Sequence, residues 1–87
     1  KGALETITLG LAKAGAPHSV LVNAVKAGFV QSAFHDKAPK PDLKERIRMI
    51  PLQRAGTPLD VARLVVYLSS EGGDYITGQV FPVTGGE

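Results

Sequence analysis

The chain has 87 residues, of which 44% are hydrophobic and 21% charged, and its formal net charge is +2. This length allows one small domain, the weak basic charge gives no indication of nucleic-acid binding, and the absence of cysteine excludes a disulfide framework, a thiolate metal site and a cysteine nucleophile. No apolar run approaches the roughly 20 residues of a membrane-spanning helix and no signal-peptide pattern opens the sequence, so we expect a soluble, cytoplasmic protein.

Residues 2–14 are expected to form a helix, because apolar residues recur at helical spacing on one face: Leu4, Ile7, Leu11 and Ala14. Gly10 costs about 1 kcal/mol relative to alanine in a helix interior, which indicates either close packing or a weak point. Gly15 and Pro17 provide the stop signal. No N-cap residue precedes Lys1, so we expect the chain to begin inside a helix of a larger protein.

Residues 20–25, with the sequence VLVNAV, are expected to form a strand. Four of the six are Val or Leu and none is charged, which is typical of a parallel strand buried on both faces. We interpret the polar Asn23 as a structural link to neighbouring backbone. The strand is expected to stop at Lys26-Ala27-Gly28. Because ligands bind beyond the carboxyl ends of strands in open α/β sheets, the expected ligand-binding segment is the loop from Ala27 to Ser32.

A Pro- and Lys-rich stretch, residues 35–41, is expected to form a mobile flap before the next helix. That helix is predicted over residues 42–50, where Asp42 and Glu45 have capping-box spacing. Its apolar face consists of Leu43, Ile47 and Ile50. The charged side chains expected to be solvated are Lys44, Arg46 and Arg48. Five apolar residues of this region form either the wall of a substrate pocket or part of the core: Phe29, Phe34, Leu43, Ile47 and Met49.

A further helix is predicted to start at Thr57-Pro58, with Thr57 as N-cap, Pro58 in the first turn and Asp60 three residues after the cap. Its buried stripe is expected to contain Val61, Leu64, Val65 and Leu68, and Gly72-Gly73 are expected to end it. The last element is a strand over residues 79–84. Pro82 cannot donate a ladder hydrogen bond, so this strand is expected at a sheet edge.

The predicted order is therefore α-β-α-α-β in a single segment, residues 1–87. Two strands alone do not form a stable sheet in water, where three or more are normally needed. We therefore expect the chain to be the end of a larger doubly wound parallel sheet of the Rossmann type, whose amino-terminal, cofactor-binding half lies outside it. Strand exchange between copies is the alternative.

Four segments in this order resemble one protein family. They are GALETITLGLAKAGAP after Lys1, VLVNAVKAGFVQS, IPLQRAGTPLDVARLVVYLSS and YITGQVFPVTGG. Together they are similar to the carboxyl-terminal third of the short-chain dehydrogenases/reductases. Members of this family carry a Tyr-x-x-x-Lys motif, and Lys1 matches its lysine. The resemblance implies that the partner tyrosine, the serine and the glycine-rich cofactor loop all lie upstream.

The resemblance also implies roles for Lys1 and for the loop after the first strand. Lys1 would hold the nicotinamide ribose hydroxyls of NAD or NADP and lower the pKa of the nearby tyrosine. Residues 28–32 resemble the Pro-Gly-x-x-x-Thr loop that meets the nicotinamide end of the cofactor, with Ala27 in place of the proline. Gly28 would let backbone approach the ligand, Val30 would offer its backbone N–H and C=O to the carboxamide, and Ser32 would stand in for the threonine.

The function implied by the resemblance is hydride transfer between a nicotinamide cofactor and a small-molecule carbonyl or alcohol, with the segment inactive by itself. Residues 33–50 would form a substrate lid, and residues 58–70 and 79–84 would supply the contacts of a tetramer or dimer. The alternative is a catalytically silent homologue or fragment that serves as a binding or oligomerisation module. No metal site is expected, because His18 and His35 lie on different segments without ligand spacing. A hydrolase is not indicated, because no G-x-S-x-G elbow surrounds Ser32.

Overall fold

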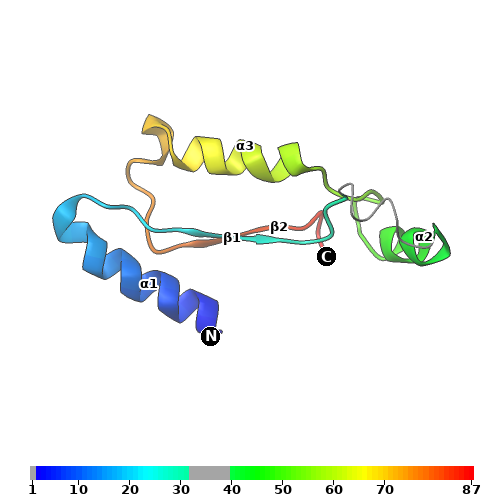
Figure 1. The fold of residues 1–87 in the computed structure, drawn as a ribbon, viewed down its shortest axis with the longest axis horizontal. Coiled ribbons are helices and arrows are strands. Elements are labelled where there is room, and N and C mark those ends of the chain that lie inside the picture. The colour runs from blue at the N-terminus through cyan, green and yellow to red at the C-terminus, as the bar shows by residue number, and fades with distance from the viewer. Residues whose placement is uncertain (1, 32–39) are drawn as a thin grey trace.

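A computed structural model of the chain describes residues 2–31 and 40–87 (Figure 1). Its main elements follow the predicted order: α1 (Ala3–Gly15), β1 (Ala24–Ala27), α2 (Lys40–Arg48), α3 (Pro58–Leu68) and β2 (Val80–Val83). Short 3₁₀ turns follow α1, at Ala16–His18, and α3, at Glu71–Gly73. None of the helices in residues 2–31 and 40–87 is long and apolar enough to cross a membrane.

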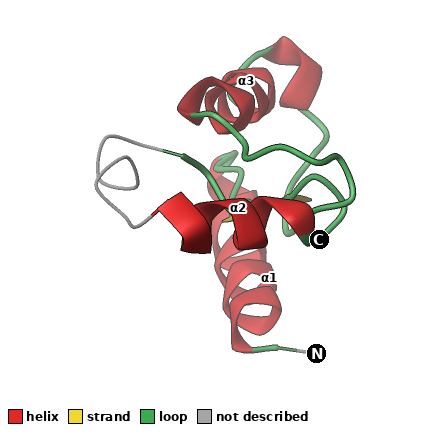
Figure 2. Cartoon of the chain, turned by 90° about the vertical axis from the view of Figure 1, so that its right-hand side faces the viewer, coloured by secondary structure: helices red, strands yellow, loops and turns green. Residues whose placement is uncertain are grey.

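The two strands pair in parallel and form a thin layer between helices. Their register runs from Ala24 opposite Val80 to Ala27 opposite Val83. α1 lies on one face of the pair and α3 on the other, while α2 lies beyond one end of the strands (Figures 1 and 2). The α-β-α-α-β order and the parallel pairing are thereby confirmed, and the arrangement is a narrow α/β/α layer structure.

The first strand is displaced from its predicted position at residues 20–25. β1 begins only at Ala24 and includes Lys26 and Ala27, which were expected in the loop. Val20 is 51% exposed, so the expected burial on both faces is wrong for this part of the chain. The reason is the partner: β2 starts at Val80, and a ladder cannot begin before it. The upstream backbone bonds to the segment before β2 instead, with the Val22 N–H donating to Thr77 Oγ1 at 2.9 Å.

Asn23 performs the structural role expected of it. Its side-chain amide donates to the Ile76 carbonyl at 2.9 Å, and its Oδ1 accepts from the Gln79 N–H at 3.1 Å. One side chain thus satisfies a donor and an acceptor on the turn that leads into β2. Because both partners lie more than fifty positions downstream, Asn23 aligns the start of the two-strand ladder.

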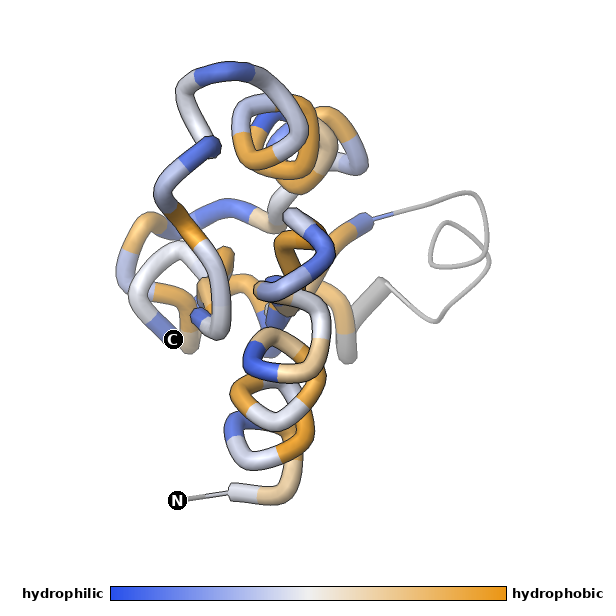
Figure 3. The backbone as a smooth tube through the Cα atoms, turned by 90° about the vertical axis from the view of Figure 1, so that its left-hand side faces the viewer, coloured by the Kyte–Doolittle hydropathy of each residue, from blue (hydrophilic) through white to orange (hydrophobic). Residues whose placement is uncertain are grey.

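α1 is confirmed as a helix, and its apolar face of Leu4, Ile7, Leu11 and Ala14 is not the face that packs on the strands. Ile7 and Leu11 are 58% and 55% exposed, whereas Thr8 and Ala12 are each only 3% exposed. The hydroxyl of Thr8 donates to the Leu4 carbonyl at 2.6 Å, which satisfies it inside the packed face. Exposed apolar residues therefore remain on α1, where hydrophobic and polar segments alternate along the helix (Figure 3). Small side chains face the strands because the backbone near Gly78 approaches α1 closely.

The two later helices differ in how well the sequence anticipated them. α2 starts at Lys40, two residues before the expected cap Asp42, and ends at Arg48. α3 begins as predicted, with the Asp60 N–H donating to Thr57 Oγ1 at 3.2 Å and the Thr57 N–H donating to Asp60 Oδ2 at 2.8 Å. It ends at Leu68, before the expected Gly72-Gly73.

Burial of the remaining predicted apolar positions is uneven. Ile50 is 1% exposed and is the largest fully buried side chain of the described residues. Of the expected α3 stripe, Val65 is 46% exposed, and the other three members, Val61, Leu64 and Leu68, are half-buried. β2 covers Val80–Val83, one residue shorter at each end than predicted, and Pro82 is exposed. Both strands of a two-strand sheet are edges, so the edge position expected from Pro82 stays a prediction.

Candidate functional site

The expected ligand-binding segment leaves the carboxyl end of β1. Ala27 is the last strand residue and pairs with Val83, and the Gly28 N–H extends the ladder by donating to the Val83 carbonyl at 2.9 Å. The chain then turns through Phe29 to Val30. The start of this loop is therefore fixed by β2, and residues 28–31 lie beyond the ends of both strands, where open α/β sheets bind ligands.

Gly28 is required by packing inside the chain. A Cβ built on it would lie 2.9 Å from Thr84 Cα and 3.1 Å from Thr84 Cβ. A backbone atom cannot rotate away, so any side chain at this position displaces one of the two segments. The close approach found at Gly28 is therefore to Thr84 of the same chain, and the approach of a ligand to this glycine stays a prediction.

Val30 is held by a second parallel pairing, an isolated bridge to Gly56. The Gly56 N–H donates to the Phe29 carbonyl and the Gln31 N–H donates to the Gly56 carbonyl, both at 2.9 Å. In this parallel bridge Gly56 forms its hydrogen bonds with the two chain neighbours of Val30, and not with Val30 itself. The N–H and C=O of Val30 therefore point away from Gly56. Within residues 2–31 and 40–87, neither group has a hydrogen bond. Val30 therefore presents one donor and one acceptor side by side.

A small cavity of about 180 Å³ is lined by both residues of this bridge. Its lining includes Phe29, Val30, Arg54, Gly56, Asp60 and Thr84. A larger hollow of about 690 Å³ lies between α1 and β2, and Lys13 and Lys26 are among its lining residues. That hollow runs along β2 on the sheet face, so the smaller cavity is the one associated with the strand ends.

A charged pair closes one side of the small cavity. Arg54 NH1 donates to Asp60 Oδ2 at 2.9 Å and to the Ala55 carbonyl at 3.1 Å. The hydrogen bond from Arg54, together with the one from the Thr57 N–H, lowers the pKa of Asp60 from 3.8 to about 2. The same contact raises the pKa of Arg54. Sequence reasoning identified Asp60 as part of a helix cap and missed Arg54, whose only signal is its position just before the cap.

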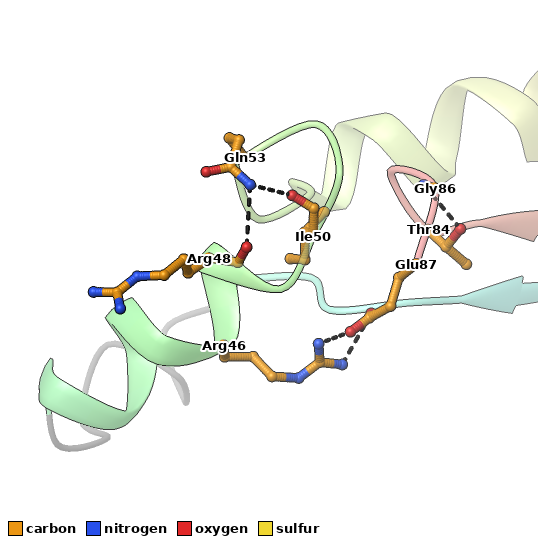
Figure 4. A network of polar contacts seen from close by, with 7 residues as sticks. All are labelled: Arg46, Arg48, Ile50, Gln53, Thr84, Gly86 and Glu87. Atoms are coloured by element: carbon orange, nitrogen blue, oxygen red, sulfur yellow. Dashed lines mark hydrogen bonds and ion pairs between the residues drawn. The ribbon is translucent and has the colours of Figure 1, made fainter.

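A second polar network joins α2 to the end of the chain (Figure 4). Arg46 forms an ion pair with Glu87, and its guanidinium lies 5.2 Å from the centre of the Phe29 ring. Its side chain is 40% exposed, so Arg46 is solvated as expected and forms these contacts at the surface. Gln53 donates to the carbonyls of Arg48 and Ile50, which fixes the turn after α2. The loop after β1, α2 and the final residues are thereby tied together.

The predicted site residues fall into two groups. Ala27, Gly28 and Val30 lie together at the carboxyl end of β1. Lys1 and Ser32 lie outside the described residues, as do Phe34, His35 and most of the predicted flap. Met49 is 71% exposed and does not belong to the core. In residues 2–31 and 40–87 no group of three His, Asp or Glu side chains is arranged to hold a metal ion.

Comparisons with known proteins identify relatives of this chain. The family model described as enoyl-(acyl carrier protein) reductase matches residues 1–87. The 3-oxoacyl-[acyl-carrier-protein] reductase of Aquifex aeolicus is 45% identical over 89 residues, which cover 99% of this chain and 35% of the relative. The uncharacterized oxidoreductase YgfF of Escherichia coli is 35% identical over 88 residues, which cover all of this chain and 36% of the relative.

A solved structure supports the same conclusion. The crystal structure of YwfH, an NADPH-dependent reductase involved in bacilysin biosynthesis, matches with a TM-score of 0.83 and 30% identity, over 97% of this chain and 36% of that protein. The chain thus spans about a third of the length of the relatives it matches. Fold, motif order and full-length family match together show that this chain belongs to the short-chain dehydrogenase/reductase family.

Proposed function

We propose that the chain forms the carboxyl-terminal part of the Rossmann domain of an NAD(P)-dependent oxidoreductase, which transfers a hydride between nicotinamide and a carbonyl or alcohol. The observation that carries this proposal is the backbone of Val30. Its N–H and C=O lie at the carboxyl end of the first strand and have no partner among the described residues. A nicotinamide carboxamide has a donor and an acceptor of its own, so it complements this pair.

The remaining roles rest on the family resemblance. Lys1 would bind the ribose hydroxyls and lower the pKa of a tyrosine four positions upstream, so that the tyrosine can exchange a proton with the substrate oxygen near neutral pH. Ser32 would donate a hydrogen bond to the carboxamide or a phosphate. The bound nicotinamide supplies the hydride chemistry. Gly28 supports this arrangement indirectly, because its contact with Thr84 sets where the loop starts.

We further propose that this segment is inactive alone, because the tyrosine, the serine and the glycine-rich loop would lie in the upstream part. The share of each relative that it covers, 35% and 36%, supports this view. For the substrate we propose a 3-oxoacyl thioester, because relatives named 3-oxoacyl-[acyl-carrier-protein] reductases are among the most similar. A cytoplasmic location and a tetramer or dimer with contacts through residues 58–70 and 79–84 complete the proposal.

A second candidate is a catalytically silent homologue that serves as an oligomerisation module. Such a module would use the exposed apolar surface of the helices. Ile7 and Leu11 on α1 and Val66 and Tyr67 on α3 are all more than half exposed. Such surface on a small chain indicates contacts with other protein, which either candidate would use.

The two candidates are separated by one experiment on the full-length protein. Titration calorimetry with NADH and NADPH, followed by a spectrophotometric assay with a 3-oxoacyl thioester, is expected to show binding and cofactor oxidation. Binding of neither cofactor, or a residue other than tyrosine four positions before Lys1, would favour the silent module. Turnover by the 87-residue segment alone would contradict the proposal that the active site needs residues from the upstream part.

A further inference from the structure

A single charged pair, Arg54 and Asp60, holds both chain neighbours of Gly56, the residue that forms the bridge to Val30. On its amino-terminal side, Arg54 NH1 donates to the Ala55 carbonyl at 3.1 Å. On its carboxyl-terminal side, the Thr57 N–H donates to Asp60 Oδ2 at 2.8 Å. Arg54 NH1 and Asp60 Oδ2 are themselves 2.9 Å apart. These contacts form a closed polar ring around the Ala55–Thr57 segment, and Gly56 lies at its centre.

Gly56 transmits this restraint to the loop after β1. It accepts from the Gln31 N–H and donates to the Phe29 carbonyl, so it bonds both neighbours of Val30. The loop has left the β1–β2 ladder after Gly28, and the bridge is the next backbone pairing along it. The direction of the Val30 N–H and C=O therefore depends on where Gly56 is held. A shift of the Ala55–Thr57 segment would tilt both groups.

We propose that Arg54 and Asp60 are positioning residues of the cofactor site: as a pair they hold Gly56, and through it they orient the backbone of Val30 toward the nicotinamide carboxamide. The inference rests on the proposed function for the identity of the ligand. It goes beyond that function because it assigns a role to two side chains that would not touch the cofactor.

The pair acts on the loop far more than on overall stability. The Arg54 side chain is 56% exposed and that of Asp60 is 24% exposed. Exposed ion pairs contribute little to the stability of a protein because water screens them. The effect of this pair on the position of the backbone is larger, because the Arg54 guanidinium and the Asp60 carboxylate both bond to the short Ala55–Thr57 segment. Removal of the pair should loosen the bridge and leave the fold intact.

The first test needs no cofactor. Native-state hydrogen exchange of the full-length protein reports on the amides of Gly56 and Gln31, the two donors of the bridge. Arg54→Met removes the guanidinium and is expected to speed exchange at both amides about tenfold, the effect of losing one charged hydrogen bond. Arg63→Met is the matched control, because Arg63 is exposed on α3 and has no ion pair among the described residues. Unchanged exchange in Arg54→Met would overturn the positioning role.

The second test measures cofactor binding by calorimetry, with whichever of NADH and NADPH binds the unaltered protein more tightly. Arg54→Met and Asp60→Asn are each expected to raise Kd about tenfold, and the double variant is expected to raise it no further, because the two residues act as one unit. Additive losses, or a Kd within about twofold of the unaltered protein, would refute the inference.

A third variant separates positioning from general destabilisation. Asn23→Ala removes the side chain that aligns the start of the β1–β2 ladder, at the end opposite Gly28, so it is expected to lower the melting temperature without changing Kd. A matching rise in Kd for Asn23→Ala would show that binding only follows stability, and would overturn the proposal. Failure of the unaltered protein to bind either cofactor would refute the proposed function, while the exchange experiment would still test the Arg54–Gly56–Val30 connection.

Discussion

Replacement of Gly28 by alanine tests how the loop is joined to β2. The new Cβ would lie 2.9 Å from Thr84 Cα, 3.1 Å from Thr84 Cβ and 3.3 Å from Thr84 Cγ2. A contact under 3.0 Å with a backbone atom cannot be relieved by a rotamer change. The β1 end or the Thr84 segment must therefore move, and the Gly28 N–H bond to the Val83 carbonyl is strained as a result.

Overpacking at Gly28→Ala is expected to lower the free energy of unfolding by about 1–3 kcal/mol. Urea denaturation of the full-length protein at one fixed concentration would measure it, because association would otherwise shift the midpoint. The expected result is a lower midpoint at an unchanged slope. Weaker cofactor binding should accompany it, because Gly28 precedes Val30 in the same loop.

Gly10→Ala is the matched control for this experiment. Within the described residues nothing lies within 4 Å of a Cβ at Gly10, which is inside α1. The same substitution should therefore raise the free energy of unfolding by about 1 kcal/mol, through helix propensity. A loss below about 0.5 kcal/mol in Gly28→Ala would refute the packing argument, since that is the range of ordinary surface substitutions.

Three further predictions concern single contacts. Asn23→Ala should lower the free energy of unfolding by about 1–3 kcal/mol, because the half-buried Ile76 carbonyl and the Gln79 N–H both lose their partner; an unchanged urea midpoint would contradict this. Thr57→Ala should cost about 1 kcal/mol through loss of the N-cap, and Thr57→Ser, which keeps the hydroxyl, should cost much less. The pKa of Asp60 is lowered in the folded protein, so its contribution is present above pH 3.8 and is lost as pH falls toward 2. Because water screens this pair, its contribution to global stability is small, and the carboxyl group itself is the better reporter: an NMR titration of Asp60 should have its midpoint near pH 2 in the unaltered protein and nearer 3.8 in Arg54→Met, and a midpoint that Arg54→Met leaves unchanged would refute the assignment.

The features that the sequence predicted correctly depend on short-range chemistry. Thr57, Pro58 and Asp60 form a cap because all the required groups lie within four positions of one another. Asn23 was interpreted correctly for a similar reason: a polar side chain in an apolar strand must find partners, whichever residues supply them. The order of the elements and the family motifs could also be predicted from the sequence.

The features that only the tertiary structure determines depend on contacts between residues far apart in the sequence. β1 lies at Ala24–Ala27, and not at residues 20–25, because its ladder starts where β2 starts. α1 buries Thr8 and Ala12 in place of its larger apolar residues, because the backbone near Gly78 approaches closely. Arg54 acquires its role for the same reason: its contacts to Ala55 and Asp60 are local, and only the Val30–Gly56 bridge connects them to the strand end. Local sequence determines which groups are available, and long-range pairing determines which of them meet.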